Sequence, residues 1–248
     1  MRFDVLTIFP GLFESVFSET IIRKAIDGGV IDIGIHDIRE YTTDRHRVTD
    51  DLPYGGGPGM VMKPEPIFRA VEEVAKKYGK GKVVLLSPRG RLFDSSLARE
   101  LADEGHLILI CGRYEGVDSR VSEHLADLEL SIGDYVLTGG EIPAMVVIDA
   151  VSRFVPGVVG TMESVTNDSF QAGLLEGPQY TRPATFRDMD VPEILLSGNH
   201  RKIGDFRLRE AIRKTLAARP DLVRREGLSD DAKKILDEIM KEEETEIE

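Results

Sequence analysis

The sequence predicts an α/β fold: a mostly parallel sheet with helices on both faces, followed by a small all-α C-terminal domain. Over residues 1–160, short apolar runs alternate with helical patterns, which is the order of elements found in parallel sheets. Residues 107–111 are continuously apolar, as expected for a strand buried on both faces. Beyond residue 181 the strand patterns end and helical patterns remain. The chain is therefore predicted to contain a larger α/β part and a smaller helical part.

In the first part, strands are predicted at residues 3–9, 30–38, 83–86, 107–111 and 128–132. Helical patterns cover residues 10–17, 19–27, 117–125 and 141–154. Pro64 and Pro66 begin a further helix, and either Asp94 or Ser95 can cap another. Residues 39–63 are polar and glycine-rich, and a loop of about 25 residues in a compact domain indicates function.

The boundary between the two parts follows Pro156 and Gly157, which end the alternating pattern. We expect a first domain at residues 1–160, a linker at residues 161–175 and a second domain at residues 176–248. Helices are predicted in the second domain at residues 192–197, 205–218 and 229–243.

Composition restricts the class of protein. The chain has 248 residues, a net charge of -12, and one cysteine, Cys111, so an internal disulfide is excluded. It contains no run of about 18 apolar residues and begins without a signal-peptide pattern, so we expect a cytoplasmic protein. Residues 201–225 hold nine Lys or Arg and three Asp or Glu, whereas residues 226–248 hold ten acids and three Lys. This distribution fits a basic surface with a binding role, and it equally fits a basic helix face followed by a solvated acidic tail.

Four polar or glycine-bearing loops follow strand ends, at residues 87–90, 112–116, 131–135 and 137–141. Ligands bind beyond the carboxyl ends of parallel strands, and glycine there exposes backbone hydrogen-bonding groups. Each loop alone can be a simple tight turn, but several at one sheet edge favour a ligand site. The phosphate-binding pattern GxxxxGK[ST] is absent, and Pro58 breaks the glycine run at residues 55–59, so neither nucleotide motif explains the loops.

Several motifs occur in a defined order: PYGGGPGM at residues 53–60, GRYEG at 112–116, SIGDYVLTGGE at 131–141 and LSGNH at 196–200. Together they resemble the bacterial tRNA (guanine-N(1))-methyltransferase family of the SPOUT superfamily. The resemblance extends to about residue 225, and the acidic tail carries no comparable signal. Each motif is weak alone, whereas the ordered set is highly specific.

The resemblance implies a deep trefoil knot in residues 1–160, which would form the catalytic domain that binds S-adenosylmethionine. It also implies a mobile linker at residues 161–175 and a tRNA-binding domain at residues 176–248. The enzyme would be a homodimer with its active site at the interface. It would methylate ring nitrogen 1 of guanine 37, next to the tRNA anticodon, and so maintain the reading frame. S-adenosylhomocysteine would be the product.

The resemblance also implies the donor site. The residues that match the family's donor loops are Leu85, Leu86, Ser87, Pro88, Gly112, Tyr114, Glu115, Ser131, Ile132, Gly133, Tyr135, Leu137, Gly139, Gly140 and Pro143. Leu85 stands where we expect an aromatic residue in the family, and Gln179 stands where the family often has histidine. The family associates Glu115 with donor-site chemistry and leaves Mg²⁺ as an option, although one carboxylate does not make a metal site.

Two residues are implied to be catalytic. Asp168 would accept the proton of the guanine ring nitrogen, and Arg153 would stabilise negative charge on the guanine carbonyl oxygen. From the residues alone, a helix N-cap is the favoured role of Asp168, and Arg153 can equally interact with the dipole at a helix C-terminus.

Two basic clusters are candidates for phosphate contacts with tRNA: Arg39, Arg45, His46 and Arg47, and Arg201, Lys202, Arg207 and Arg209. We expect residues 161–171 to close when donor and RNA bind. Two other functions fit the same residues: a SPOUT methyltransferase for another RNA site, and a non-catalytic RNA-binding protein that dimerises through its α/β domain.

Overall fold

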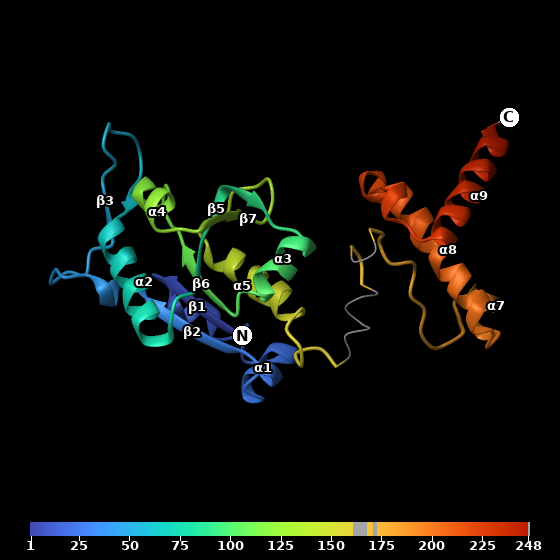
Figure 1. Ribbon diagram of the computed structural model, residues 1–248, viewed down its shortest axis with the longest axis horizontal. Coiled ribbons are helices and arrows are strands. Elements are labelled where there is room, and N and C mark those ends of the chain that lie inside the picture. The colour runs from blue at the N-terminus through green and yellow to red at the C-terminus, as the bar shows by residue number, and fades with distance from the viewer. Residues whose placement is uncertain (161–167, 171–172, 248) are drawn as a thin grey trace. The chain divides into compact units, whose positions relative to one another are not determined.

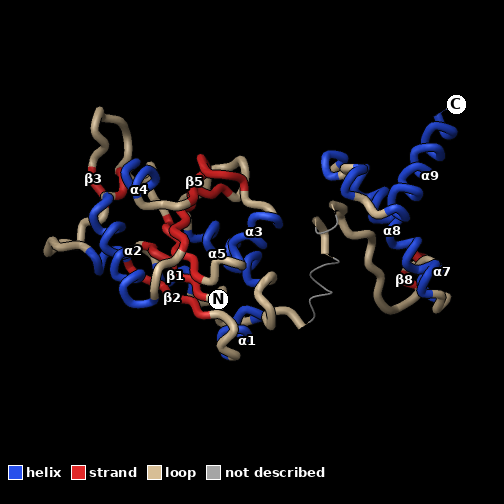
Figure 2. The backbone as a smooth tube through the Cα atoms, in the orientation of Figure 1, coloured by secondary structure: helices blue, strands red, loops and turns tan. Residues whose placement is uncertain are grey.

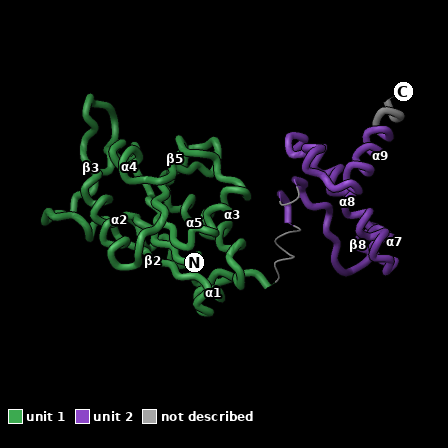
Figure 3. The backbone as a smooth tube through the Cα atoms, in the orientation of Figure 1, with its two compact units in different colours: residues 1–161 green, residues 162–248 purple. Residues whose placement is uncertain are grey.

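The computed structural model describes residues 1–160, 168–170 and 173–247, with side chains up to residue 242. The chain forms two compact units, Met1–Thr161 and Met162–Glu248, shown in separate colours in Figure 3. In the described residues, no helix is long and apolar enough to cross a membrane.

Unit 1 is built on a five-stranded sheet with the order β2-β1-β6-β5-β7, and every neighbouring pair is parallel. Figures 1 and 2 show this sheet with helices packed around it. The strands are β1 (Arg2–Thr7), β2 (Asp32–Asp37), β5 (Lys82–Leu92), β6 (His106–Cys111) and β7 (Leu128–Ser131). The predicted parallel sheet is confirmed.

Both faces of the sheet are covered, because alternate side chains of each central strand enter different cores. In β6, Leu107 and Leu109 pack in one core with residues of α1 (Thr20–Asp27), α3 (Ser95–Ala102) and α5 (Glu141–Ser152). Ile108 and Ile110 pack in the other core with residues of α2 (Pro64–Tyr78) and α4 (Ser119–His124). All six residues of β6 are buried, which explains the continuously apolar run at residues 107–111.

The ends of several elements follow local chemistry. Asp94 caps α3, and its Oδ1 accepts a hydrogen bond from the Leu97 nitrogen over 2.8 Å. β5 continues past the predicted end at residue 86, because its register with β7 shifts between Leu86 and Arg91 and pairing then resumes. Only Pro10–Phe13 (η1) of the helix predicted at residues 10–17 forms, as a 3-10 turn.

The region predicted as one long loop, residues 39–63, contains short elements. They are a 3-10 turn, η2 (Ile38–Tyr41), and an antiparallel pair of two-residue strands, β3 (Asp50–Asp51) and β4 (Val61–Met62). The glycine-rich motif at residues 53–60 connects these two strands. The region is therefore a hairpin-like segment that follows β2 and leads into α2.

A buried charged cluster lies near the beginning of the sheet strands. The Asp4 carboxylate is fully buried, and Nε2 of His36 and Nε2 of His106 lie 2.7 Å and 2.8 Å from its two oxygens. Arg2 donates to both oxygens as well. Burial alone would raise the pKa of Asp4, but the hydrogen bonds from His36, Arg2 and His106 lower it to about 2. The cluster ties β1 to both of its neighbours, β2 and β6.

Unit 2 is mainly helical. Its helices are α7 (Glu193–Leu196), α8 (His200–Ala218) and α9 (Asp230–Ile247), with 3-10 turns η3 (Pro220–Leu222) and η4 (Arg225–Gly227). A small core centred on Ile212, Leu228 and Ile239 joins α8 to α9. α8 begins five residues earlier than predicted because the Asn199 side chain accepts from the Lys202 nitrogen over 3.2 Å.

One prediction for unit 2 is wrong, because the unit is not entirely helical. β8 (Thr185–Phe186) and β9 (Met189–Asp190) form an antiparallel hairpin. Two-residue strands are too short to show an alternating pattern, so the sequence carried no signal for them.

Candidate functional site

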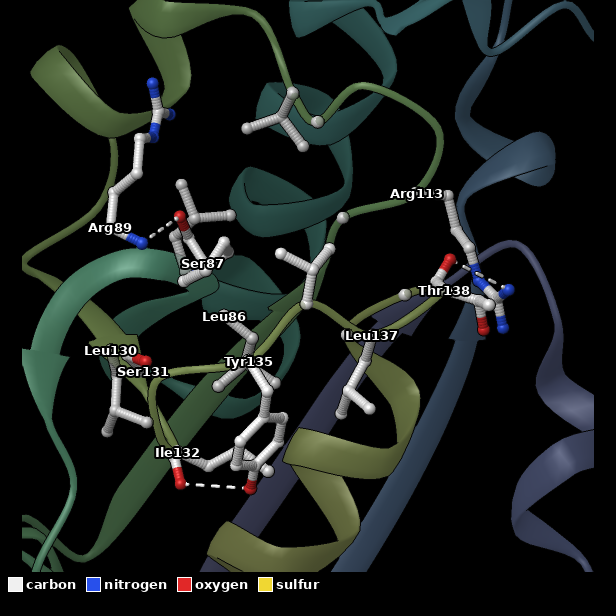
Figure 4. Close-up of a pocket in the computed structure, with 18 of the residues that line it drawn as sticks. Leu86, Ser87, Arg89, Arg113, Leu130, Ser131, Ile132, Tyr135, Leu137 and Thr138 are labelled. Atoms are coloured by element: carbon white, nitrogen blue, oxygen red, sulfur yellow. Dashed lines mark hydrogen bonds between the residues drawn. The ribbon is translucent and has the colours of Figure 1, made fainter.

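The predicted donor loops meet at the carboxyl edge of the sheet, where they surround a cavity of about 310 Å³ (Figure 4). Every predicted donor residue except Pro143 lines this cavity. The structure adds Arg89, Arg113, Gly116 and Thr138, which lie in the predicted loops but were not matched to donor motifs. It also adds Val117, Leu130 and Val136, which sequence reasoning missed. Pro143 lies half-buried in the first turn of α5, outside the lining.

The loop after β7 is held in shape by hydrogen bonds between its own residues. Ser131 Oγ donates to the Gly133 carbonyl over 3.1 Å, and the Tyr135 hydroxyl donates to the Ile132 carbonyl over 3.2 Å. Figure 4 shows the Tyr135 ring lying along this loop. Gly133 has φ of +150°, and a Cβ there would lie 2.5 Å from the Tyr135 ring. The loop therefore requires glycine so that an exposed aromatic ring can fold back beside the cavity.

The glycine-rich motif at residues 53–60 contacts the loop after β6. The Glu115 nitrogen donates to the Met60 carbonyl over 3.0 Å, and a Cβ on Gly59 would overlap the Glu115 side chain. Tyr114, which precedes Glu115 in this loop, adopts φ of +60°, and its side chain is exposed. Two motifs that lie more than fifty residues apart in the sequence are thus brought together at one site.

A buried ion pair holds the loop after β6 against the start of α5. Arg113 Nε donates to Oε2 of Glu141 over 2.8 Å, and Thr7 Oγ1 donates to Oε1 of Glu141 over 2.8 Å. Glu141 and Thr7 are fully buried. The Arg113 guanidinium also donates to the Thr138 carbonyl over 3.1 Å, as Figure 4 shows. Arg113 and Glu141 are 28 positions apart in the sequence, and Thr7 and Glu141 are 134 positions apart. No local sequence pattern could therefore reveal this network.

The two predicted catalytic residues do not line the donor cavity. Glu141 begins α5 beside the donor loops, and Arg153 follows the last residue of the same helix. Because a helix of 12 residues is about 18 Å long, Arg153 lies about that distance from the donor loops at the Glu141 end.

Asp168 belongs to unit 2, where it lines a separate cavity of about 380 Å³ together with Leu174, Gln179 and Arg207. Residues 168–170 form a bend and a turn. Residues 161–167 and 171–172, which include most of the segment expected to close on the substrate, lie outside the described residues. The N-cap alternative for Asp168 therefore stays open.

The first basic cluster is only partly free for the predicted phosphate contacts. Arg39 donates to the Ile8 carbonyl, lies 3.5 Å from the Asp37 carboxylate and stacks near the Phe9 ring. Arg45, His46 and Arg47 are exposed on a loop whose turn is held by the Asp44 carboxylate.

The second basic cluster lies on α8. Arg201, Lys202 and Arg207 are exposed, and Arg207 lines two neighbouring cavities of unit 2. Arg209 instead pairs with Glu238 and Glu242 of α9. Hydrogen bonds from Arg209 and Arg213 lower the pKa of Glu242. Part of the acidic tail is therefore a folded helix that neutralises part of the basic surface.

Among the described residues, no group of three or more His, Cys, Asp or Glu side chains is arranged to hold a metal ion. Glu115 is the one carboxylate that lines the donor cavity within this part of the chain.

Comparison with known proteins identifies the family. Residues 1–225 match the family model described as tRNA (Guanine-1)-methyltransferase TrmD. A tRNA (guanine-N(1)-)-methyltransferase of Dehalococcoides mccartyi (strain ATCC BAA-2266 / KCTC 15142 / 195) is 54% identical over 244 residues, covering 98% of both chains. The protein of that name from Geobacter metallireducens is 54% identical over 239 residues, covering 96% of this chain and 98% of the relative. The one from Geobacillus kaustophilus is 52% identical over 244 residues, covering 98% of this chain and all of the relative. The chain thus belongs to the tRNA (guanine-1)-methyltransferase family.

Proposed function

We propose that this protein transfers a methyl group from S-adenosylmethionine to ring nitrogen 1 of guanine 37 in tRNA, next to the anticodon, and so maintains the reading frame. One observation carries the proposal. The loops that match the family's donor motifs come from separate parts of the chain, yet they line one cavity at the carboxyl edge of the sheet.

The donor cavity suits a ligand that is read by backbone groups. Its lining includes Gly112, Gly133, Gly139 and Gly140, and a Cβ on Gly140 would lie 2.7 Å from the Cys111 Cα. Glycine therefore keeps the loops close and leaves N–H and C=O groups accessible. When bound, S-adenosylmethionine supplies a methyl group on a positively charged sulfur. The residues that would hold it are those of the four loops.

Methyl transfer to a guanine ring nitrogen requires loss of the proton on that nitrogen. Asp168 accepts this proton, and Arg153 stabilises the negative charge that develops on the guanine carbonyl oxygen. Alignment of nitrogen, methyl and sulfur provides much of the rate enhancement, since the displacement is in line. Asp168 lines a cavity beside Arg207, which supports a position close to RNA.

The proposal includes a homodimer with a shared active site. In one chain, Arg153 lies about a helix length from the Glu141 end of α5. Along the same helix, Ile142 is 55% exposed and Val146 is 40% exposed. Leu12, in the adjacent η1, is 47% exposed. A second copy of the chain that covers this apolar surface would bring its own residues to the site.

The proposal also includes a trefoil knot. Loop 137–140 follows edge strand β7, and β5 lies between β7 and β6 in the sheet. Even so, the Gly140 nitrogen donates to the Gly112 carbonyl of the loop after β6 over 2.9 Å. This return of the chain across β5 supports a threaded path.

Unit 2 binds the anticodon stem-loop in this proposal, because Arg201, Lys202 and Arg207 offer exposed positive charge for phosphate contacts. Arg45, His46 and Arg47 of unit 1 provide a second contact, and the target base is unstacked because its Watson–Crick edge reacts. We derive no step through Mg²⁺, since one lining carboxylate does not form a cation site. The activity belongs in the cytoplasm, where tRNA serves translation.

The test is transfer of labelled methyl from S-adenosylmethionine to two tRNA transcripts, one with guanine and one with adenine at position 37, and to ribosomal RNA. Label in the first alone is the expected result. Label in both would indicate methylation at another base, and label in ribosomal RNA alone would indicate a different SPOUT substrate. A folded protein that binds tRNA and labels neither transcript would favour the non-catalytic RNA-binding function.

A further inference from the structure

The loop after β6 and the loop before α5 are fastened together at one point of the donor cavity. Arg113 and Gly139 form an isolated antiparallel bridge, and the Arg113 guanidinium also donates to the Thr138 carbonyl over 3.1 Å. A Cβ on Gly139 would overlap the Arg113 side chain. Arg113 therefore forms part of the cavity wall and holds the neighbouring loop in place.

Without an ion-pair partner, Arg113 would place an uncompensated positive charge in the wall of the donor cavity. Its side chain is 18% exposed, and it is paired with Glu141, whose side chain is 1% exposed. Both oxygens of Glu141 are used, one by Arg113 and the other by Thr7. The carboxylate is thus fixed behind the wall, where its charge offsets that of Arg113.

The charge of the wall matters because of the chemistry of the donor. S-adenosylmethionine carries a positive sulfonium, whereas its product S-adenosylhomocysteine carries a neutral thioether. The two ligands differ only in the methyl group on sulfur and the charge that it brings, so an unpaired positive charge in the wall would oppose the donor more than the product. Charges interact strongly across a partly buried site, where screening by water is weak.

We propose that Glu141 is a positioning residue that acts through Arg113: it neutralises the guanidinium and fixes its side chain, so that the cavity accepts a cationic methyl donor. This inference rests on the proposed function, because it takes S-adenosylmethionine as the ligand of the cavity. It assigns to Glu141 a role in discrimination between donor and product.

The experiment measures the dissociation constants of both ligands by calorimetry, for the wild type and for Glu141→Gln. Glutamine has nearly the same shape as glutamate but no charge. We expect the ratio of the donor constant to the product constant to rise by about tenfold. Arg113→Gln leaves the buried carboxylate unbalanced, so the ratio should fall instead. The double variant should return to a ratio near that of the wild type.

Two controls separate charge from general damage. Arg113→Lys keeps the positive charge and should preserve the ratio even if both affinities fall. Glu104→Gln breaks another ion pair, in which Lys82 Nζ lies 2.5 Å from Glu104 Oε1. Neither residue of that pair lines the donor cavity, so this variant should leave both constants unchanged.

Equal weakening of both ligands in Glu141→Gln would overturn the inference, because a merely structural role affects donor and product alike. If Glu141→Gln does not fold, Arg113→Gln provides the test. A fall in the ratio of the donor constant to the product constant would support the inference, and an unchanged or higher ratio would overturn it. Failure of the proposed function is distinguishable: the wild type would then bind neither ligand, or would bind the donor without labelling guanine 37.

Discussion

Arg209 Nη1 donates to Oε1 of Glu242 over 2.8 Å, and this contact joins the basic helix α8 to the acidic helix α9. The second Glu242 oxygen accepts from Arg213 Nη2, also over 2.8 Å. Two of the positive charges on α8 are therefore engaged by the C-terminal helix.

Loss of this shared carboxylate should strengthen RNA binding. We expect Glu242→Gln to raise the affinity for tRNA, because Arg209 and Arg213 each lose one carboxylate partner while Arg209 keeps Glu238 and Arg213 keeps Glu210. Each new phosphate contact should steepen the plot of log affinity against log salt by about 0.7 to 0.9. Filter binding at several salt concentrations measures this slope. Glu226→Gln, an exposed acid outside this cluster, serves as the charge-matched control. An equal effect of both substitutions would show that net charge alone acts.

Asp168→Asn should abolish most turnover while it preserves binding. Asparagine cannot accept the ring-nitrogen proton, so the single-turnover rate should fall by about 10²- to 10⁴-fold. Dissociation constants for donor and tRNA should stay within about threefold of the wild type. Rapid-quench methylation assays give the rate, and Asp205→Asn, on α8, provides the control. An unchanged rate would remove Asp168 from the catalytic role.

Gly140→Ala should damage the donor site without unfolding unit 1. The added Cβ would lie 2.7 Å from the Cys111 Cα and 3.0 Å from the Gly112 nitrogen, both of which are backbone atoms. The loops must move apart to make room for the alanine side chain, so the affinity for the donor should fall at least about tenfold. Calorimetry with S-adenosylmethionine checks this expectation. Gly160→Ala, where a Cβ meets nothing within 4 Å, should bind the donor normally.

Mixed dimers should reveal a shared active site. One chain would carry Gly140→Ala and the other Asp168→Asn, so each homodimer is nearly inactive. If Asp168 serves the donor cavity of the partner, one site in each mixed dimer combines an intact cavity with an intact Asp168. Co-purified heterodimers should then recover about half of the wild-type rate. No recovery in these heterodimers would mean that Asp168 acts on the cavity of its own chain.

The Asp4 cluster should make the free energy of unfolding depend on pH in the acid range. The pKa of Asp4 is about 2 in the folded chain, against an ordinary value of 3.8. The ionised carboxylate thus contributes stability above about pH 4, on the order of 2 kcal/mol, and this contribution is lost as the pH falls toward 2. Asp4→Asn should lower the free energy of unfolding at pH 7 and have a smaller effect at pH 3. Urea denaturation measures both, and the more exposed Asp32→Asn should change the free energy less.

Much of the donor cavity could be predicted because parallel strands place successive loops at one edge. The loops at Gly112 and Ser131 lie at the ends of β6 and β7 in this way, whereas Ser87 lies within β5, where the register with β7 shifts. What the sequence could not show were pairings across the fold. Arg113 meets Glu141, and Asp4 meets His36 and His106, only because the strand order brings distant segments together.

Helix geometry explains two other differences. Pro143 follows the loop that ends at Gly140, but it already lies in the first turn of α5 and so leaves the lining. Arg153 matches the family motif by position, yet it follows the last residue of α5 and does not line the cavity. The β8–β9 hairpin was missed because four residues cannot establish a period of two.

The position of Cys111 has a consequence for how the protein tolerates reactive chemicals. Its side chain is fully buried in the core although it directly precedes the donor loop at Gly112. Burial raises the pKa of the thiol well above its usual range, so almost no thiolate forms. Cys111 is also the sole cysteine of the chain. Peroxide and alkylating agents that inactivate enzymes through an exposed thiol therefore find no such target here while the fold is intact.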